Sequence, residues 1–300
     1  MASFRLYNIQ LLPLDTQTIP EVGIEGYKKL FEKLSETVSA AHKSKTLIER
    51  SYKLPHDTYI APFVIRSKTR YAEGKWVKYQ TAQTVVDLYT SKSLFTASEG
   101  QAPVSNTYLF RFVYDYEAHR IAVEELGGRL PSPRNLLKAL HHLLTPVANQ
   151  NFPEHTLTIN LVSEKKALEQ VLSEAKGFKK AEVSITFPNG HEMSKRLRQL
   201  KENNVHVMKA EASSEKSALM PSLPDFILDL VRASTEYGKA KLSYITEKIQ
   251  RRQIFSTEEY PDKIQLRQSK KETDEKFMER VQKKLRFNSG LGSDEIKAKK

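Results

Sequence analysis

One predicted helix carries an arginine and two histidines that could act on a phosphodiester. Arg134 is followed on it by His141 and His142, with six residues between Arg134 and His141. A histidine can transfer a proton as a general acid or base, and an arginine can stabilise charge on a phosphoryl group. Metal-free nucleases that use such a pair are helical bundles, whereas β-rich segments flank this helix. Capping and surface roles explain these residues better, so we expect no catalytic residue here.

A second set of residues could hold magnesium in a nuclease. Asp225, Asp229 and Glu236 precede Lys239, and Glu236 with Lys239 forms an E-x-x-K fragment. Magnesium nucleases place their acids on adjacent strands with an E-x-K spacing, because two carboxylates must share the metal. Here the acids fall on a predicted helix and the spacing is one residue too long, which disfavours this reading.

Other motifs of metal and cofactor chemistry are missing from the sequence. The chain has no cysteine, which excludes disulfides, thiolate nucleophiles and cysteine-based zinc sites. Gly127 and Gly128 separate a strand from a helix without a phosphate-binding glycine motif around them. The eight histidines form no His-x-His or H-E-x-x-H pair. We therefore expect no cofactor and no metal.

The positive charge of the chain is concentrated in three windows. The 48 Lys and Arg residues exceed the 36 Asp and Glu residues, for a net charge of +12. Residues 43–82, 176–209 and 232–300 each carry a marked excess of basic residues, and the rest of the chain is acidic on balance. A basic surface on a near-neutral body indicates a polyanionic partner.

Two basic clusters are the predicted nucleic-acid contacts, because Ser, Thr and Tyr residues accompany their Lys and Arg residues. Such mixtures contact phosphate and sugar oxygens and read little sequence. Solvated lysine faces on ordinary strands are the structural alternative. The predicted contacts are Arg66, Lys68, Arg70, Lys75 and Lys78 in the first cluster and Lys239, Lys241, Lys248, Arg251 and Arg252 in the second.

Hydrophobic periodicity predicts an α+β fold with a mixed sheet and crossover helices. Strand-like segments cover residues 4–12, 45–54, 58–66, 75–79 and 84–89, with a helix starting at Ile24; residues 107–126 read as a hairpin, and residues 91–106 as a boundary or mobile loop. Ser132 and Pro133 mark the start of a helix. Strands at 156–162, 181–187 and 205–210 alternate with helices, the second starting near Asn189, which predicts parallel pairing. A helix from Asp225 and a meander follow.

These elements predict a β-rich N-terminal domain over residues 1–105 and an α+β domain over residues 106–268. A charged tail over residues 269–300 should form a lone helix or stay disordered until it meets a partner. Lys239 and Lys241 should share one face of their strand, with Leu242 and Tyr244 on the other. No apolar run is long enough to span a bilayer, and the start of the chain does not resemble a secretory signal. We expect a cytoplasmic protein without membrane insertion.

Several segments resemble a bacterial family found in mobile elements and defence loci. The segments are residues 106–112 (NTYLFRF), 157–162 (LTINLV) and 181–190 (AEVSITFPNG), followed by Arg196-Leu197 and Asn203-Asn204-Val205. Size, charge and layout are also similar to RexA-like phage-exclusion proteins and to the DNA-binding subunit of the Kiwa defence system. The resemblance implies a DNA-binding defence or exclusion protein that forms a homodimer, and it carries no catalytic residues.

The sequence therefore favours a nucleic-acid-binding protein, with double-stranded DNA as the first partner and no catalysis of its own. A toxin-like nuclease, metal-dependent or metal-free, is one alternative. The other is an interaction subunit whose basic surface meets an acidic protein from the same locus.

Overall fold

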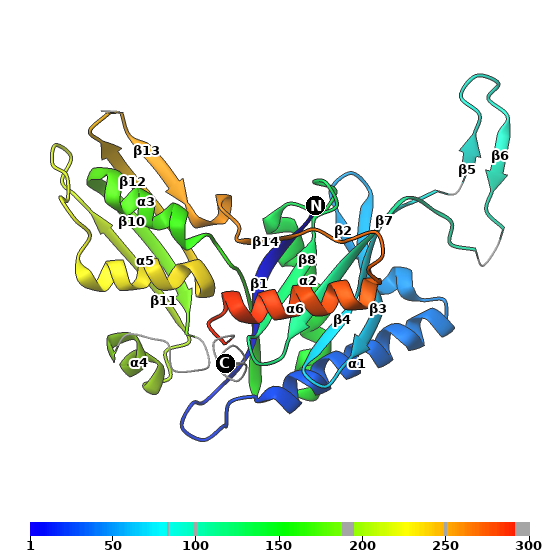
Figure 1. Cartoon of the computed structure of the whole chain (residues 1–300), viewed down its shortest axis with the longest axis horizontal. Coiled ribbons are helices and arrows are strands. Elements are labelled where there is room, and N and C mark those ends of the chain that lie inside the picture. Colours follow the sequence, from blue (N-terminus) through cyan, green and yellow to red (C-terminus); the bar gives the residue numbers. More distant parts are fainter. Residues whose placement is uncertain (83, 99–100, 188–194, 249–250, 292–300) are drawn as a thin grey trace.

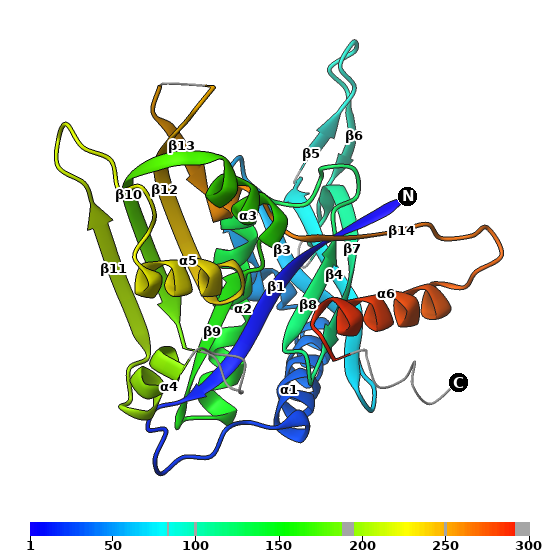
Figure 2. The same cartoon turned by 60° about the vertical axis from the view of Figure 1, so that its left-hand side comes forward.

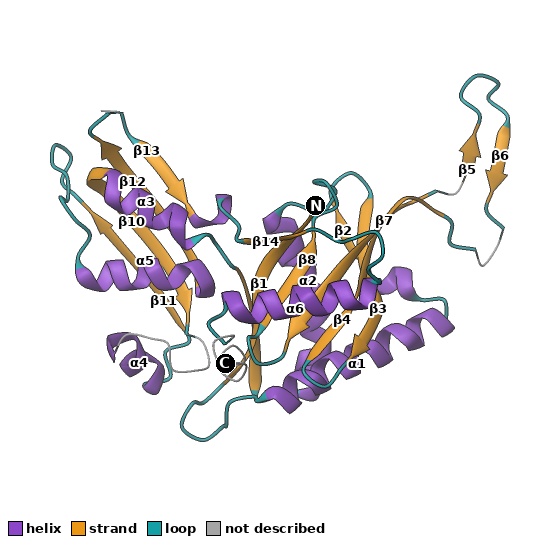
Figure 3. Ribbon diagram, viewed as in Figure 1, coloured by secondary structure: helices purple, strands orange, loops and turns teal. Residues whose placement is uncertain are grey.

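The computed structural model describes residues 1–82, 84–98, 101–187, 195–248 and 251–291 (Figure 1). Two large antiparallel sheets lie side by side, and helices pack against both (Figures 1 and 3). The chain is α+β, as the sequence predicts.

The first sheet has eight strands and gathers both ends of the chain. Strands from either side of residue 105 share it, and β14 brings residues near the C-terminus against β1. Its order is β14 (Lys263–Leu266), β1 (Ala2–Pro13), β8 (Arg120–Glu124), β7 (Val104–Asp115), β4 (Tyr71–Thr81), β3 (Thr58–Ser67) and β2 (Tyr52–Leu54), and β9 (His155–Leu161) also pairs with β1. β7 and β8 form the hairpin that the sequence predicts.

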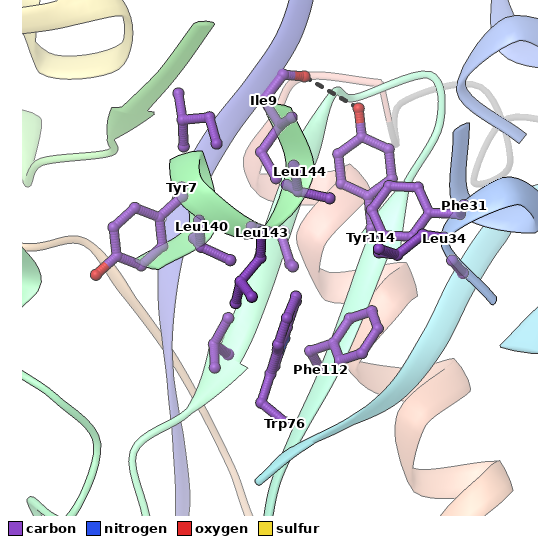
Figure 4. Packing of buried hydrophobic residues seen from close by; sticks show 14 of the residues in the cluster. Tyr7, Ile9, Phe31, Leu34, Trp76, Phe112, Tyr114, Leu140, Leu143 and Leu144 are labelled. Atoms are coloured by element: carbon purple, nitrogen blue, oxygen red, sulfur yellow. Dashed lines mark hydrogen bonds between the residues drawn. The ribbon is translucent and has the colours of Figure 1, made fainter. Parts of the chain in front are cut away.

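Two helices cover one face of this sheet. α1 (Ile24–Lys43) and α2 (Pro133–Asn151) bury their apolar stripes against β1, β4 and β7. Phe31 of α1 stacks on Tyr114 with ring centroids 4.5 Å apart, and the Tyr114 hydroxyl donates to the carbonyl of Ile9 (Figure 4). Trp76 is fully buried in the same cluster (Figure 4). The predicted start of α2 is confirmed, since the Ser132 side chain accepts a hydrogen bond from the Asn135 amide.

The charged tail forms a helix that covers the opposite face. α6 (Asp274–Asn288) lies across the first sheet in Figures 1 and 2. Phe277, Met278, Val281 and Leu285 are buried against β1, β7, β8 and β14. A tail dense in charge therefore contains one narrow apolar stripe, and that stripe completes the core of the first sheet.

The second sheet has four strands in the order β11 (Val207–Ser213), β10 (Ala175–Thr186), β12 (Gly238–Thr246) and β13 (Gln253–Ser256). α3 (Lys165–Glu174) and α5 (Asp225–Tyr237) pack on one face, where Leu168, Leu230 and Leu242 belong to one buried cluster. The short helix η1 (Leu47–Arg50) lies between α1 and β2, and η2 (Thr257–Glu259) lies between β13 and β14. α4 (Lys195–Glu202) precedes β11. The other face of this sheet is open (Figure 2).

The prediction of parallel strands is wrong. Every pairing among the described residues is antiparallel. β9 and β10 belong to different sheets, so α3 joins two sheets and does not cross over one. α4 lies beyond the end of the second sheet (Figure 1), which lets β11 return beside β10 as in a long hairpin. The predicted helix start at Asn189 lies outside the described residues.

A two-stranded hairpin projects from the first sheet. β5 (Thr84–Val86) and β6 (Ser93–Thr96) pair only with each other among the described strands, and the hairpin extends away from the body in Figures 1 and 2. Leu88 and Tyr89 at its tip are 84% and 92% exposed. None of the helices in the described ranges is both long and apolar enough to cross a membrane.

Candidate nucleic-acid interface

The open face of the second sheet brings together polar residues from three strands. Ser184 on β10 pairs with Lys209 of β11 on one side and with Lys239 of β12 on the other. Directly paired residues point to the same face of an antiparallel sheet. With strands about 4.8 Å apart, the backbones of the two lysines are about 10 Å apart, and Ser184 lies between them. The adjacent row across the sheet contains Glu182 and Lys241.

Two acidic residues of this face, Glu182 and Glu211, are paired with a lysine of the same face. Lys180 lies 2.5 Å from an oxygen of Glu182 and 3.0 Å from an oxygen of Glu211. Its hydrogen bond lowers the pKa of Glu182, and the two carboxylates raise the pKa of Lys180. Glu182 therefore stays ionised at neutral pH, and Lys180 compensates part of the charge of the two carboxylates.

Three lysines on the same face have no such partner. Within the described part of the chain, no acidic group lies within 4.0 Å of the amino groups of Lys209, Lys239 or Lys241. All three are exposed, and they line a groove of about 700 Å³ together with Ser184, Ser256 and the carboxylates of Glu182, Glu211 and Glu258. Three ammonium groups and two hydroxyls in one groove form a set of donors for the oxygens of a polyanion.

The rest of the second predicted cluster lies at the turn between β12 and β13. Lys248, Arg251 and Arg252 are exposed. The Arg252 Nε atom donates to the Ser243 hydroxyl at 2.6 Å, and Ser243 lies on the same strand face as Lys241. The turn therefore continues the basic edge of the groove. The predicted division of β12 is confirmed, because Leu242 and Tyr244 are buried on the helix side and Lys239 and Lys241 are exposed.

The open face has no platform for stacked bases. The aromatic residues of the four strands are Phe178, Tyr244 and Phe255, and all three are buried on the helix side. Proteins that hold single strands usually stack bases on exposed aromatic rings. This face offers ammonium and hydroxyl groups instead, which suit a phosphate backbone.

Strand β4 places two lysines of the first predicted cluster on opposite faces of the sheet. Lys75 and Lys78 are three residues apart on β4 and point to opposite faces of the sheet. Lys78 contacts the carbonyl of Arg129 and lies over the Tyr108 ring, 5.3 Å from its centroid. Burial, with a smaller contribution from Arg129, lowers the pKa of Lys78.

Acidic residues lie beside three other members of this cluster, Lys68, Arg66 and Lys75. Lys68 lies 2.7 Å from Glu275 of α6 and 3.7 Å from Glu73. Arg70 is exposed in the turn between β3 and β4. Arg66 and Lys75 line a smaller pocket beside the first turn of α6. The structure therefore gathers the second cluster on one groove and scatters the first over two faces and a turn.

Two of the residues that could support catalysis, Glu236 and His141, have structural partners. Glu236 is buried and lies 2.7 Å from Arg120 and 2.6 Å from Lys165. His141 is half-buried, and its ring bonds the backbone of Ile159. Among the described residues, no three His, Asp or Glu side chains are grouped closely enough to hold a metal ion.

Sequence reasoning missed three of the groove's donor residues, Lys209, Ser184 and Ser256. Lys209 and Ser184 fall on strands that alternate polar and apolar residues, and that alternation marks them as members of a polar face. The missing information was strand direction and register, because the sequence predicts parallel pairing and the antiparallel register is what places Lys209 opposite Ser184.

Comparison with known protein families shows which family this chain matches and how much of the chain the match covers. The model of the domain of unknown function DUF4747 matches residues 4–286. The chain belongs to the DUF4747 family. The DUF4747 match includes both sheets and most of α6, so the groove and the first sheet are parts of one family unit. No curated protein matches the chain significantly.

Proposed function

We propose that this DUF4747 protein binds nucleic acid through the open face of its second sheet, and that its preferred nucleic acid is double-stranded DNA. The observation that carries the proposal is the set of three lysines, Lys209, Lys239 and Lys241, that line one groove without an ion-pair partner among the described residues. Phosphate contacts of this kind give binding that is sensitive to salt and weakly selective for sequence.

Two further features support a duplex as the partner. The net charge of +12 favours association with a polyanion over long range. The lack of exposed aromatic rings on the four strands removes the usual advantage of single strands. The resemblance to RexA-like exclusion proteins and to the Kiwa DNA-binding subunit supports a role in phage defence or in a mobile element, inside the cell.

Removing the three lysines should weaken duplex binding and reduce its dependence on salt. We expect the Lys209→Ala, Lys239→Ala, Lys241→Ala variant to bind a 30-base-pair duplex at least about tenfold more weakly at 100 mM salt. Each lost phosphate contact should reduce the slope of log K against log salt by about 0.9, so the slope should fall by about 3. Fluorescence anisotropy at four salt concentrations measures both quantities.

The matched control removes the same charge from three helices outside the groove. The Lys43→Ala, Lys138→Ala, Lys166→Ala variant changes exposed lysines of α1, α2 and α3 and should keep most of the affinity. Equal losses in the two variants would show that only net charge matters and would remove the groove from the proposal. The absence of any duplex binding by the wild type at low salt would favour an acidic protein partner. Loss of intact duplex or RNA, with or without magnesium, would favour the nuclease alternative.

We also propose that the protein acts as a homodimer through the β5–β6 hairpin. An isolated two-stranded hairpin is marginally stable in water, so its exposed apolar side chains call for a partner. Residues 84–98 contain one acidic and one basic residue, and they can therefore meet their copy without the repulsion that the +12 body imposes. Pairing of the two hairpins about a twofold axis would bury the tips at Leu88 and Tyr89.

The oligomeric state tests this second proposal. Wild-type protein should elute with the mass of a dimer in light scattering, and the Leu88→Ser, Tyr89→Ser variant should shift towards the monomer by at least about tenfold in dissociation constant. Leu14→Ser, which changes an exposed leucine in the loop after β1, should leave the mass unchanged. A monomeric wild type at micromolar concentration would contradict the proposal.

A further inference from the structure

A second pocket lies on the first sheet, next to the first turn of α6. It has a volume of about 360 Å³ and is bounded by β3, β4, β7 and α6. Phe63, Val64, Leu109 and Met278 supply apolar walls. The volume is in the usual range for small-molecule sites, and the walls would suit a flat, partly apolar ligand.

A buried carboxylate in this pocket has an oxygen without a partner. Glu73 is only 6% exposed, and no described residue forms a hydrogen bond with its Oε2 atom. Its Oε1 atom is 3.7 Å from Lys68, which is too long for a hydrogen bond. Burial, with a smaller contribution from Glu275, raises the pKa of Glu73 against the opposing charge of Lys68. Buried polar atoms are almost always satisfied, so an orphaned oxygen in a pocket wall indicates a place for a ligand donor.

Two cations stand beside this carboxylate without ion-pair partners of their own. Arg66 pairs directly with Glu73 across β3 and β4, and Lys75 follows two residues along the same strand face. Neither has an acidic group within 4.0 Å among the described residues. The third basic side chain of the pocket, Arg111, already donates to both carboxylate oxygens of Glu124 and forms an ion pair with Asp274. Asp274 and Glu275 of α6 also line the pocket, and their charges act on Lys75 and Arg66 without a direct ion pair. The donor groups of the two cations therefore remain open to a ligand.

We propose that this pocket binds a free nucleoside monophosphate. The phosphate, with up to two negative charges, would meet Arg66 and Lys75, and the amino or imino edge of the base would donate to Glu73. The apolar walls would contact the base and the ribose. An amino-acid zwitterion has the same two kinds of group, but its single carboxylate would leave one of the two cations unmatched.

Titration calorimetry with the four ribonucleoside 5′-monophosphates tests this assignment. We expect at least one of them to bind the wild-type chain with a Kd of about 10 µM. Inorganic phosphate alone and the corresponding nucleoside alone should each bind at least about tenfold more weakly, because each makes only part of the contacts. Alanine serves as the zwitterionic probe with a single carboxylate and should bind no better than phosphate.

Two variants connect the binding to the named groups. Glu73→Gln keeps the shape of the side chain and should weaken the best nucleotide at least about tenfold, because an amide replaces one acceptor by a donor. Lys75→Gln should weaken it similarly, whereas Lys138→Gln on α2 should have no effect. Four results would each overturn the proposal. The first two are unchanged nucleotide binding in Glu73→Gln and binding of inorganic phosphate as tight as that of the nucleotide. The other two are tighter binding of an amino acid and no nucleotide binding below 1 mM.

A duplex-binding measurement separates the two sites. The Glu73→Gln, Lys75→Gln variant should bind the 30-base-pair duplex as the wild type does, since the groove of the second sheet is intact. A loss of duplex binding would assign the pocket to the nucleic acid strand and overturn the proposal of a free nucleotide. Failure of the groove variants to change duplex binding would leave the nucleotide titrations unaffected.

Discussion

Replacing Phe277 by alanine should lower the free energy of unfolding by about 4 kcal/mol, in the range measured for fully buried aromatic residues. The side chain is 0% exposed, and its ring centroid lies 6.0 Å from that of Phe4. The Arg111 guanidinium lies over the same ring at 4.9 Å. Truncation would leave a cavity between α6 and the first sheet and would remove the aromatic ring from the cation–π contact with Arg111.

Phe287 on the same helix provides the matched control. It is 55% exposed, so Phe287→Ala should cost less than about 1 kcal/mol. Urea denaturation followed by circular dichroism measures both variants. Equal costs at the two positions would mean that α6 does not pack on the first sheet, and the pocket beside its first turn would then lose one wall.

The packing of α6 on the first sheet shows which parts of the fold could be predicted from the sequence. The sequence predicts a lone helix or a disordered segment for the tail, and the structure shows a helix whose apolar residues pack on the first sheet. The surface that receives them was not visible, because Phe4, Val113 and Ile264 come from three distant strands. Local pattern predicts an element, whereas its packing partner depends on contacts that are remote in sequence.

The two basic clusters show the same division between local and remote information. The alternation along β12 predicts correctly that Lys239 and Lys241 share an exposed face. The same rule, applied to Lys75 and Lys78, would have separated them, because an odd spacing places two residues on opposite faces of a strand. The acids of α6, Asp274 and Glu275, lie about 200 positions away in sequence and still reach the first cluster. No local pattern could have shown that contact.

Strand direction was the largest error, and its cause is physical. A helix between two strands predicts parallel pairing only when the helix crosses the face of one sheet. α3 instead leads from β9 in the first sheet to β10 in the second. The sequence contains both strands and the helix, but the assignment of each strand to a sheet depends on which apolar faces meet in the folded chain.

The buried ion pair between the two sheets gives the second large effect. Arg120 on β8 is 5% exposed, and its Nη2 atom donates to Glu236 at the end of α5 over 2.7 Å. Replacing Arg120 by methionine keeps much of the side-chain volume and removes the charge. We expect a loss of about 3–5 kcal/mol at pH 7, because the variant leaves Glu236 buried with only the largely exposed Lys165 as a partner.

The loss of stability in Arg120→Met should depend on pH. In the wild type, burial alone would raise the pKa of Glu236, but the charges of Arg120 and Lys165 outweigh it and hold the pKa below its ordinary value of 4.5. The stabilisation from this carboxylate is therefore present above pH 4.5 and is lost as the pH falls through the lower pKa of the folded state. Without Arg120, we expect burial to raise the folded pKa above 4.5. The cost of the variant should then be largest at neutral pH and should shrink as the pH approaches 4.

An exposed ion pair of similar geometry separates this effect from a general loss of charge. Arg232 lies 2.8 Å from Glu169, and both side chains are about half exposed. Arg232→Met should therefore cost less than about 1 kcal/mol and show little change with pH, because solvent screens the pair. The double variant Arg120→Met, Glu236→Leu should recover much of the stability that Arg120→Met loses, since it leaves no buried charge unpaired. Urea denaturation at pH 7, 5.5 and 4 compares all four proteins. A flat pH profile for Arg120→Met, or a double variant no more stable than the single one, would show that the pair does not hold the two sheets together.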